Sequence, residues 1–322
     1  MLIPLMPIGV SEIVDVLRAA GEPTRLRILA LLAREELAVM ELCQIMDQSQ
    51  PRVSRHLRLL TASRLAERFP DGGWVFYRLA AEPSRQSIID RVLSIVDPDD
   101  ALLARDRDRL TAVRAKRSAE AEAYFARNAP RWDQLRSLYV SEADVEAAIL
   151  AAAPPGPIGR LIDLGSGSGR MLILLAGRAR SALGLDLSQQ MLNIARLRVT
   201  EAGLPGVELR HGDIFATGLP EDCADLVVVH QVLHYLGDPA AAVTEAGRLV
   251  APGGRLLIVD FAPHALEGLR EAHQHRRLGF PDEDMERWLA AAGLERPRIT
   301  TLPARDAEGL TVKIWAADRK PS

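Results

Sequence analysis

The sequence predicts two domains of different fold class: a mainly α winged helix-turn-helix domain at the N-terminus, and an α/β domain built on a parallel sheet after it. The length of 322 residues fits two domains, since one domain usually holds about 100–200 residues. Apolar residues recur at helical spacing up to residue 96 and flank a single hairpin, whereas short apolar runs alternate with helical stretches after residue 124. The predicted limits are 1–97, a charged helical linker over 98–123, and 124–322.

The composition is that of a globular protein without a membrane span. Hydrophobic residues make up 48% and charged residues 26% of the chain, and no apolar run reaches the roughly 18 residues that a span requires. Residues 1–10 contain Pro4 and Pro7 and no basic side chain, which is not the pattern of a secretory signal. Only Cys43 and Cys223 are available for a disulfide, so a reducing, cytoplasmic compartment is predicted.

The first domain is predicted to hold five helices and one hairpin. Apolar stripes at helical spacing mark the helices, around 11–20, 23–32, 39–45, 50–60 and 84–96. Ser49 is a good N-cap for the fourth helix, and Pro51 is tolerated in its first turn. The runs 65–69 and 74–79 are strand-like and are joined by turn residues over 70–73, which predicts a hairpin. Helices followed by a hairpin are typical of a winged helix-turn-helix.

The fourth helix is predicted to enter the DNA major groove. Residues 49–78 hold six arginines against Glu67 and Asp71, although the net charge of the whole chain is −3. Val53, Leu57 and Leu60 form its buried face, and arginine forks on the other faces match guanine edges or phosphates. An ordinary solvated helix face is the alternative. The predicted DNA-binding residues are Ser49, Gln50, Arg52, Ser54, Arg55, His56 and Arg58, with Arg78 from the hairpin.

Three segments of the first domain resemble the ArsR/SmtB transcriptional regulators: EPTRLRIL at 22–29, ELC at 41–43 and SQPRVSRHL at 49–57. The resemblance covers about residues 11–97. It implies a homodimer that is held by its first and last helices and recognises a pseudo-palindromic operator in double-stranded DNA. Arsenic- and cadmium-type members carry Cys-x-Cys before the recognition helix, whereas Cys43-Gln44-Ile45 keeps one thiolate. Zinc-type members use Asp and His on the last helix, but 84–97 has no His, so no metal site is predicted.

Pro-Asp-Asp at residues 98–100 interrupts the helical pattern. A highly charged helix with few apolar residues is expected over 101–123, as a linker. Short apolar strands alternate with helical stretches further on. They are predicted at 161–164, 182–186, 207–209, 226–229 and 256–259, with two more at 297–301 and 310–316. This alternation predicts a buried parallel sheet with crossover helices.

A glycine-rich turn at 165–169 follows the first of these strands and begins a helix. Asp186 ends the next strand, 23 residues after Asp163, and is suited to binding a ribose diol. A nicotinamide-binding fingerprint would place its third glycine at position 170, where the chain has Arg170. The spacing G-x-G-x-G, with Asp163 two residues before it, instead resembles the first motif of class I S-adenosylmethionine-dependent methyltransferases.

Later motifs of that family are matched in the same order, by LDLSQQML at 185–192, HGDI at 211–214, LVVVHQVLHY at 226–235 and LVAPGGRL at 249–256. The stretch 124–133 is similar to the entry helices of the family's quinone- and small-molecule-type members. The resemblance covers about 124–322 and implies a Rossmann-like fold with S-adenosylmethionine or S-adenosylhomocysteine as cofactor. It implies that Asp186 holds the ribose, Met191 covers the adenine and Asp213 accepts from the adenine amino group. The predicted cofactor-binding residues are Tyr124, Asp163, Gly165, Ser166, Gly167, Gly169, Asp186, Leu187, Met191, Gly212, Asp213, Ile214 and His230.

Methyl transfer to oxygen or nitrogen requires proximity and often a base. His230, His234 and Tyr235 are the candidate catalytic residues; His264, Glu271, His273 and His275 follow the next strand. Each also has a structural interpretation, such as packing on the cofactor. A DNA methyltransferase would carry Pro-Pro-Tyr/Phe after the fourth strand, and residues 231–234 do not, so DNA is expected as a target site and not as methyl acceptor.

The sequence therefore predicts a DNA-binding regulator joined to a methyltransferase-fold domain that senses S-adenosylmethionine or S-adenosylhomocysteine. The alternative is an active small-molecule methyltransferase with an attached DNA-binding domain, which would need a small-molecule methyl acceptor. A metal-responsive repressor is the third possibility.

Overall fold

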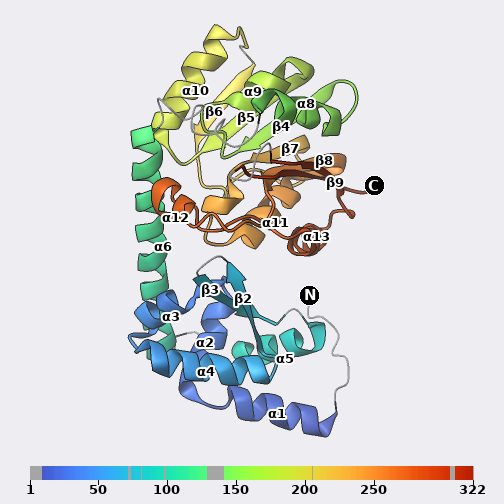
Figure 1. Ribbon diagram of the computed structural model, residues 1–322. Coiled ribbons are helices and arrows are strands. Elements are labelled where there is room, and N and C mark those ends of the chain that lie inside the picture. The colour runs from blue at the N-terminus through green and yellow to red at the C-terminus, as the bar shows by residue number, and fades with distance from the viewer. Residues whose placement is uncertain are drawn as a thin grey trace. The chain divides into compact units, whose positions relative to one another are not determined.

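The computed structural model describes residues 9–71, 74–80, 82–97, 99–128, 141–204, 206–304 and 309–321. The chain divides into two compact units, Met1–Ala119 and Glu120–Ser322, and each is described here by itself (Figure 1). The first is mainly helical and the second is α/β, which confirms the predicted fold class. The entry segment expected over 124–133 lies outside the described residues from 129 onward.

The N-terminal unit is a winged helix-turn-helix. Its elements before the last helix are α1 (Val10–Ala20), α2 (Pro23–Leu32), β1 (Leu37–Ala38), α3 (Val39–Met46), α4 (Gln50–Ala62), β2 (Ala66–Asp71), β3 (Trp74–Leu79) and α5 (Pro83–Ser94). Strands β2 and β3 form the predicted hairpin, and β1 pairs with the other side of β3 in an antiparallel sheet.

The recognition helix α4 is fixed by its apolar face. Val53, Leu57 and Leu60 are fully buried in the core of the unit, as their spacing predicts. Ser49 occupies the N-cap position with an extended backbone, but its hydroxyl makes no capping hydrogen bond. Pro51 in the first turn favours the start of α4, because its ring fixes a helical φ and it has no N–H that needs a partner.

Helix α6 (Ala101–Asn128) is the charged helix that the sequence predicts. Its first half is not a free linker, because Leu110 and Val113 lie buried in the same core as α2 and α4. Two apolar residues three positions apart lie on the same face of a helix and can pack together against a core. Among so many charged residues, they do not form the continuous apolar stripe that predicts a buried helix face. The domain limits 1–97 and 124–322 remain predictions.

The C-terminal unit holds a seven-stranded sheet in the order β6-β5-β4-β7-β8-β10-β9. Its strands are β4 (Ile158–Leu164), β5 (Ala179–Asp186), β6 (Val207–His211), β7 (Ala224–His230), β8 (Val250–Phe261), β9 (Arg298–Leu302) and β10 (Val312–Asp318). The first five in the sheet order run parallel, whereas β10 is antiparallel to both of its neighbours. The predicted parallel sheet is therefore mixed at one edge.

Helices cover both faces of this sheet (Figure 1). They are α8 (Glu142–Ala152), α9 (Arg170–Leu175), α10 (Gln189–Glu201), α11 (Pro239–Leu249), α12 (Gly268–His273) and α13 (Asp282–Ala291). Residues of α8 and α9 belong to one core and those of α11 and α13 to the other. Because side chains alternate along a strand, Val227 and Val229 of β7 face one core, and Leu226 and Val228 face the other.

Candidate functional site

The predicted cofactor residues gather at the carboxyl edge of the parallel strands. Gly165, Gly167 and Gly169 form the turn after β4 and all have positive φ, at 72°, 50° and 82°, which L side chains rarely adopt. A Cβ on Gly165 would lie 2.5 Å from a methyl group of Val232, so glycine is also required there for space. The same contact brings the segment after β7 against the glycine-rich turn.

Asp186 connects the glycine-rich turn to the end of β5. One carboxylate oxygen accepts the amide of Gly167 at 2.7 Å, and the other accepts the amide of Ser188 at 2.8 Å. Burial raises the pKa of Asp186 above its ordinary value, against the lowering effect of these two amides. The carboxylate is thus held at the strand end where the predicted ribose diol would donate to it.

A second feature of the glycine-rich turn, the hydroxyl of Ser166, also suits a polar ligand. The hydroxyl of Ser166 is buried and has no hydrogen-bond partner among the described residues. Buried hydroxyls are normally satisfied, so this one can accept or donate to a group that enters the turn. A glycine turn, a buried hydroxyl and Asp186 together match the donors and acceptors of an adenosyl amino acid.

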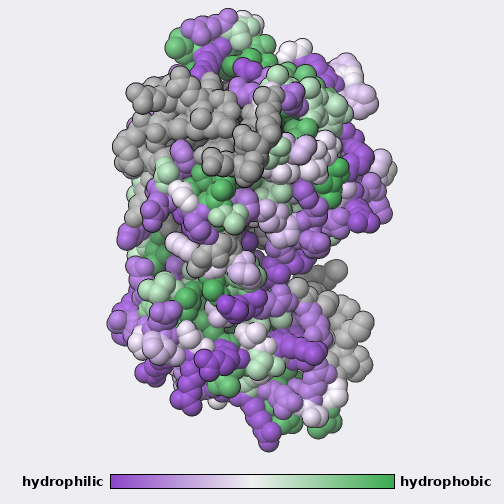
Figure 2. Space-filling model, in the orientation of Figure 1, coloured by the Kyte–Doolittle hydropathy of each residue, from purple (hydrophilic) through white to green (hydrophobic). Residues whose placement is uncertain are grey.

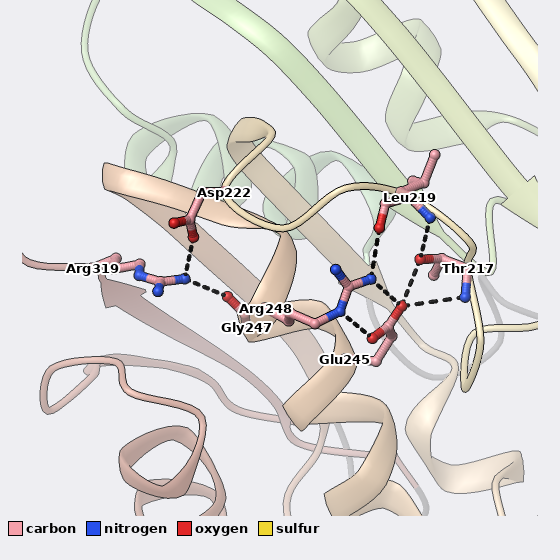
Figure 3. Close-up of polar contacts among 7 residues, drawn as sticks. All are labelled: Thr217, Leu219, Asp222, Glu245, Gly247, Arg248 and Arg319. Atoms are coloured by element: carbon pink, nitrogen blue, oxygen red, sulfur yellow. Dashed lines mark hydrogen bonds and ion pairs between the residues drawn. The ribbon is translucent and has the colours of Figure 1, made fainter.

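The loop between β6 and β7 carries the predicted adenine contacts. A Cβ on Gly212 would clash with a terminal methyl group of Leu185, whose side chain would have to shift, and Asp213 accepts the amide of Phe215 at 2.9 Å. Helix α11 holds this loop, because Glu245 accepts both the amide and the hydroxyl of Thr217 (Figure 3). The same close-up shows Arg248 donating to Glu245 and to the Leu219 carbonyl, and Arg319 bridging Asp222 and the Gly247 carbonyl.

The remaining predicted cofactor residues differ in exposure. Asp163 and Met191 are buried, Ile214 and His230 are half-buried, and Leu187 is exposed. The side chain of Tyr124, on α6, lies outside the described side chains. Burial of Met191 in the helix that follows β5 limits its predicted contact with adenine to whatever part of its side chain borders the site.

Two of the three candidate catalytic residues lie in a short 3-10 helix (Leu233–Tyr235) after β7. His234 is 1% exposed, and its Nδ1 lies 2.7 Å from Oδ1 of Asp260 in β8. Asp260 is 0% exposed and also accepts the amide of Phe261. The sequence reasoning missed Asp260, although an acidic residue inside the apolar run of β8 was a signal for it.

Other histidines surround this pair. The ring of His275 lies 4.2 Å from that of His234, between centroids, and is stacked beside Phe261 at 5.8 Å. Burial lowers the pKa of His275, and the nearby His234, His264, His273 and Arg270 lower it further. His275 is therefore a neutral side chain at physiological pH, and it packs against the His234–Asp260 pair.

On the recognition helix, the structure separates three arginines from the other predicted DNA contacts. Arg52, Arg55 and Arg58 are exposed, and within the described part of the chain their side chains make no hydrogen bond or ion pair. Nδ1 of His56 lies 3.3 Å from Oε2 of Glu22, at the start of α2, so this ring nitrogen faces the protein. Ser49 and Gln50 are exposed and Ser54 is half-buried.

Arg78 differs from the three arginines of α4, because it is paired within its own domain. Its guanidinium lies 2.9 Å from Glu67 and 3.5 Å from Glu36, and 4.9 Å from the centroid of the Phe69 ring. A DNA phosphate would have to compete with these two carboxylates for the guanidinium, and the contact of Arg78 with DNA stays a prediction.

Cys43 is half-buried, and burial raises the pKa of its thiol, which disfavours the thiolate that a metal would need. The described residues include no group of three or more His, Cys, Asp or Glu side chains that could hold a metal ion.

The described residues also include no helix long and apolar enough to cross a membrane. The face drawn in Figure 2 is mostly hydrophilic, with hydrophobic residues in separate patches.

Comparisons with known proteins support the family assignment of both domains. Residues 22–68 match the family described as bacterial regulatory protein, arsR family, and residues 162–258 match a methyltransferase domain. Trans-aconitate 2-methyltransferase of Methylobacterium nodulans is 34% identical over 57% of this chain and 70% of its own length. Demethylmenaquinone methyltransferase of Thermus thermophilus is 33% identical over 43% of this chain and 64% of its own length.

A solved structure shares the fold. One chain of the complex between the Haloferax volcanii Trm112 methyltransferase activator and a methyltransferase is similar with a TM-score of 0.51 and 18% identity, over 61% of this chain and 97% of that one. The chain thus belongs to the class I S-adenosylmethionine-dependent methyltransferases and carries an ArsR-family helix-turn-helix domain at its N-terminus. Its cofactor is S-adenosylmethionine or S-adenosylhomocysteine, as the motifs predict.

Proposed function

We propose that this chain is an ArsR-type transcriptional regulator whose methyltransferase domain binds S-adenosylmethionine or S-adenosylhomocysteine as an effector. The proposal rests on one observation: the recognition helix exposes three arginines that have no partner among the described residues, in the same chain as a nucleoside-binding turn. Helix α6 supports it, because it begins in the DNA-binding unit and runs without interruption to Asn128.

The proposed regulator acts as a homodimer in the cytoplasm on a pseudo-palindromic operator. Two recognition helices related by a two-fold axis read half-sites about one helical turn of DNA apart. The family resemblance implies a dimer held by the first and last helices, and exposed apolar side chains there support it. Val10 and Leu17 on α1 are 80% and 51% exposed, and Ile95 after α5 is 84% exposed. A second copy would bury these side chains.

The proposal is tested by DNA binding in the presence of each ligand. A duplex selected by the chain from a random 30-base-pair pool is labelled and titrated at fixed salt, without ligand, with S-adenosylmethionine and with S-adenosylhomocysteine. We expect its affinity to differ by about 5–150-fold between ligand-free and ligand-saturated protein. Identical curves in all three conditions would reject the effector role.

The His234–Asp260 pair favours a second candidate function, an active small-molecule methyltransferase. S-adenosylmethionine supplies an electrophilic methyl group when it is bound. Asp260 would accept a hydrogen bond from Nδ1–H of His234, so that Nε2 of the neutral ring would be the acceptor for a proton from the substrate. Transfer of a radiolabelled methyl group to a metabolite extract, lost in His234→Ala with cofactor affinity retained, would establish this function.

A further inference from the structure

The end of α3, directly before the recognition helix, is held by two arginines from other helices. Nη1 of Arg109 on α6 donates to the carbonyl of Ile45 at 3.2 Å, and its Nη2 donates to the Asp47 carboxylate at 3.1 Å. Nη2 of Arg27 on α2 lies 3.4 Å from the carbonyl of Met46. The final carbonyls of a helix have no partner within it and carry partial negative charge, so guanidinium groups stabilise this end.

Arg27 is in turn fixed by α6. Its Nε and Nη2 donate to the two oxygens of Asp106, both at 2.6 Å, and Asp106 is 1% exposed. A two-bond arrangement between a guanidinium and a carboxylate allows one relative orientation, unlike a single contact. Asp106 and Arg109, less than one turn apart on α6, therefore both act on the last residues of α3.

These contacts lie where the chain turns into the recognition helix. Asp47 has a left-handed backbone with φ of 55°, and α4 begins at Gln50. The direction of α4 depends on this three-residue turn and on the Val53, Leu57 and Leu60 face behind it. A shift of α6 along or around its axis would move the Arg27 and Arg109 contacts and hence the turn.

We propose that Asp106 and Arg109 are positioning residues for the recognition helix, and that α6 carries the ligand state of the methyltransferase domain to it. The second part rests on the proposed function; the first does not. Neither residue contacts DNA in this proposal. Their effect is to hold Arg52, Arg55 and Arg58 in register with the bases.

The test compares two pairs of variants in the full-length chain. Asp106→Asn removes the charge that fixes Arg27, and Asp108→Asn makes the same change at an exposed position of the same helix. Arg109→Ala removes the contacts to α3, with Arg105→Ala as its exposed control. Each variant is titrated with the duplex selected by the wild-type chain and with a random-sequence duplex, and thermal unfolding shows whether it is folded.

The readout is the ratio of specific to non-specific affinity, which a loss of stability alone does not change at a temperature where the variant is folded. We expect about a tenfold fall in this ratio for Asp106→Asn and Arg109→Ala, the size of one lost base contact, and no change in the controls. If Asp106→Asn unfolds, the result for Arg109→Ala tests the positioning role alone. This variant is expected to fold, because the side chain of Arg109 is 35% exposed. A wild-type ratio in folded Arg109→Ala would overturn the positioning role.

The proposed transmission of the ligand state through α6 is tested by a separate measurement. In wild type, S-adenosylmethionine changes operator affinity; in Arg109→Ala we expect that change to shrink at least threefold, while calorimetry gives an unaltered affinity for the ligand. A full ligand response in Arg109→Ala would overturn transmission. A wild-type chain without any ligand response would instead reject the proposed function, whatever Arg109→Ala does to the specificity ratio.

Discussion

At the residue scale, Asp186 joins the loops that follow β4 and β5 into one binding surface. Its carboxylate accepts amides from the turn after β4 and from the residue that caps α10, so both loops are tied to one side chain. The same oxygens are the proposed acceptors for the ribose hydroxyls. Ligand binding and loop order therefore depend on the ionised form of one carboxyl group.

This gives a pH prediction. Burial raises the pKa of Asp186, and a ribose hydroxyl donates to its ionised form, so ligand binding favours loss of the proton. Affinity for S-adenosylmethionine should fall on acidification, starting at a pH above the ordinary range of an aspartic acid. Asp186→Asn should bind about 1.5–3 kcal/mol more weakly at neutral pH and lack this pH dependence. Calorimetry from pH 5 to 8 measures both, and equal affinities in the two proteins would exclude the ribose role.

His234 carries a stability prediction that holds whether or not the chain is an enzyme. Replacing it with Phe keeps an aromatic ring in place and leaves the buried Asp260 carboxylate without its ring partner. Breaking a buried pair on one side costs about 3–5 kcal/mol of unfolding free energy. Urea unfolding measures this cost, with the exposed His211→Phe as a matched control. A cost of less than about 1 kcal/mol would mean that the Asp260 carboxylate is satisfied in another way.

At the scale of elements, α4 was predictable and its surroundings were not. Helical spacing alone places Val53, Leu57 and Leu60 inside and the arginines outside. The pairing of Arg78 with Glu36 and Glu67 depends on which strands lie side by side, and no local pattern contains that information. An acidic residue within the apolar run of β8 is visible in the sequence, but the pairing of Asp260 with His234 is not, because the two residues lie 26 positions apart on different elements.

The exposed arginines of α4 lead to a prediction about DNA. Arg52→Ala and Arg55→Ala should each weaken operator binding by about 1–3 kcal/mol if the side chain reads a base. If it contacts a phosphate, the loss should be similar on all sequences and the salt dependence should fall by about one ion. Arg34, exposed after α2, provides the control substitution. Unchanged affinity in a double Arg52→Ala, Arg55→Ala variant would remove α4 from the DNA interface.

At the scale of the whole molecule, the motifs predicted both domains, because each family motif is local in sequence. The helix between them was harder to interpret, since the ion pair of Asp106 with Arg27 joins residues 79 positions apart. Charges that look solvent-facing in the sequence thus attach α6 to the DNA-binding unit. The proposed coupling of the two ligand-binding functions depends on this helix.

The most direct test of that coupling is the reciprocal titration. Affinity for S-adenosylmethionine is measured by calorimetry on the free protein and on protein saturated with the selected duplex, at the same salt and pH. Thermodynamic linkage requires the duplex to change ligand affinity by the same factor by which the ligand changes duplex affinity. The account predicts equal factors of about 5–150-fold. Ligand affinity that is the same with and without DNA would contradict it.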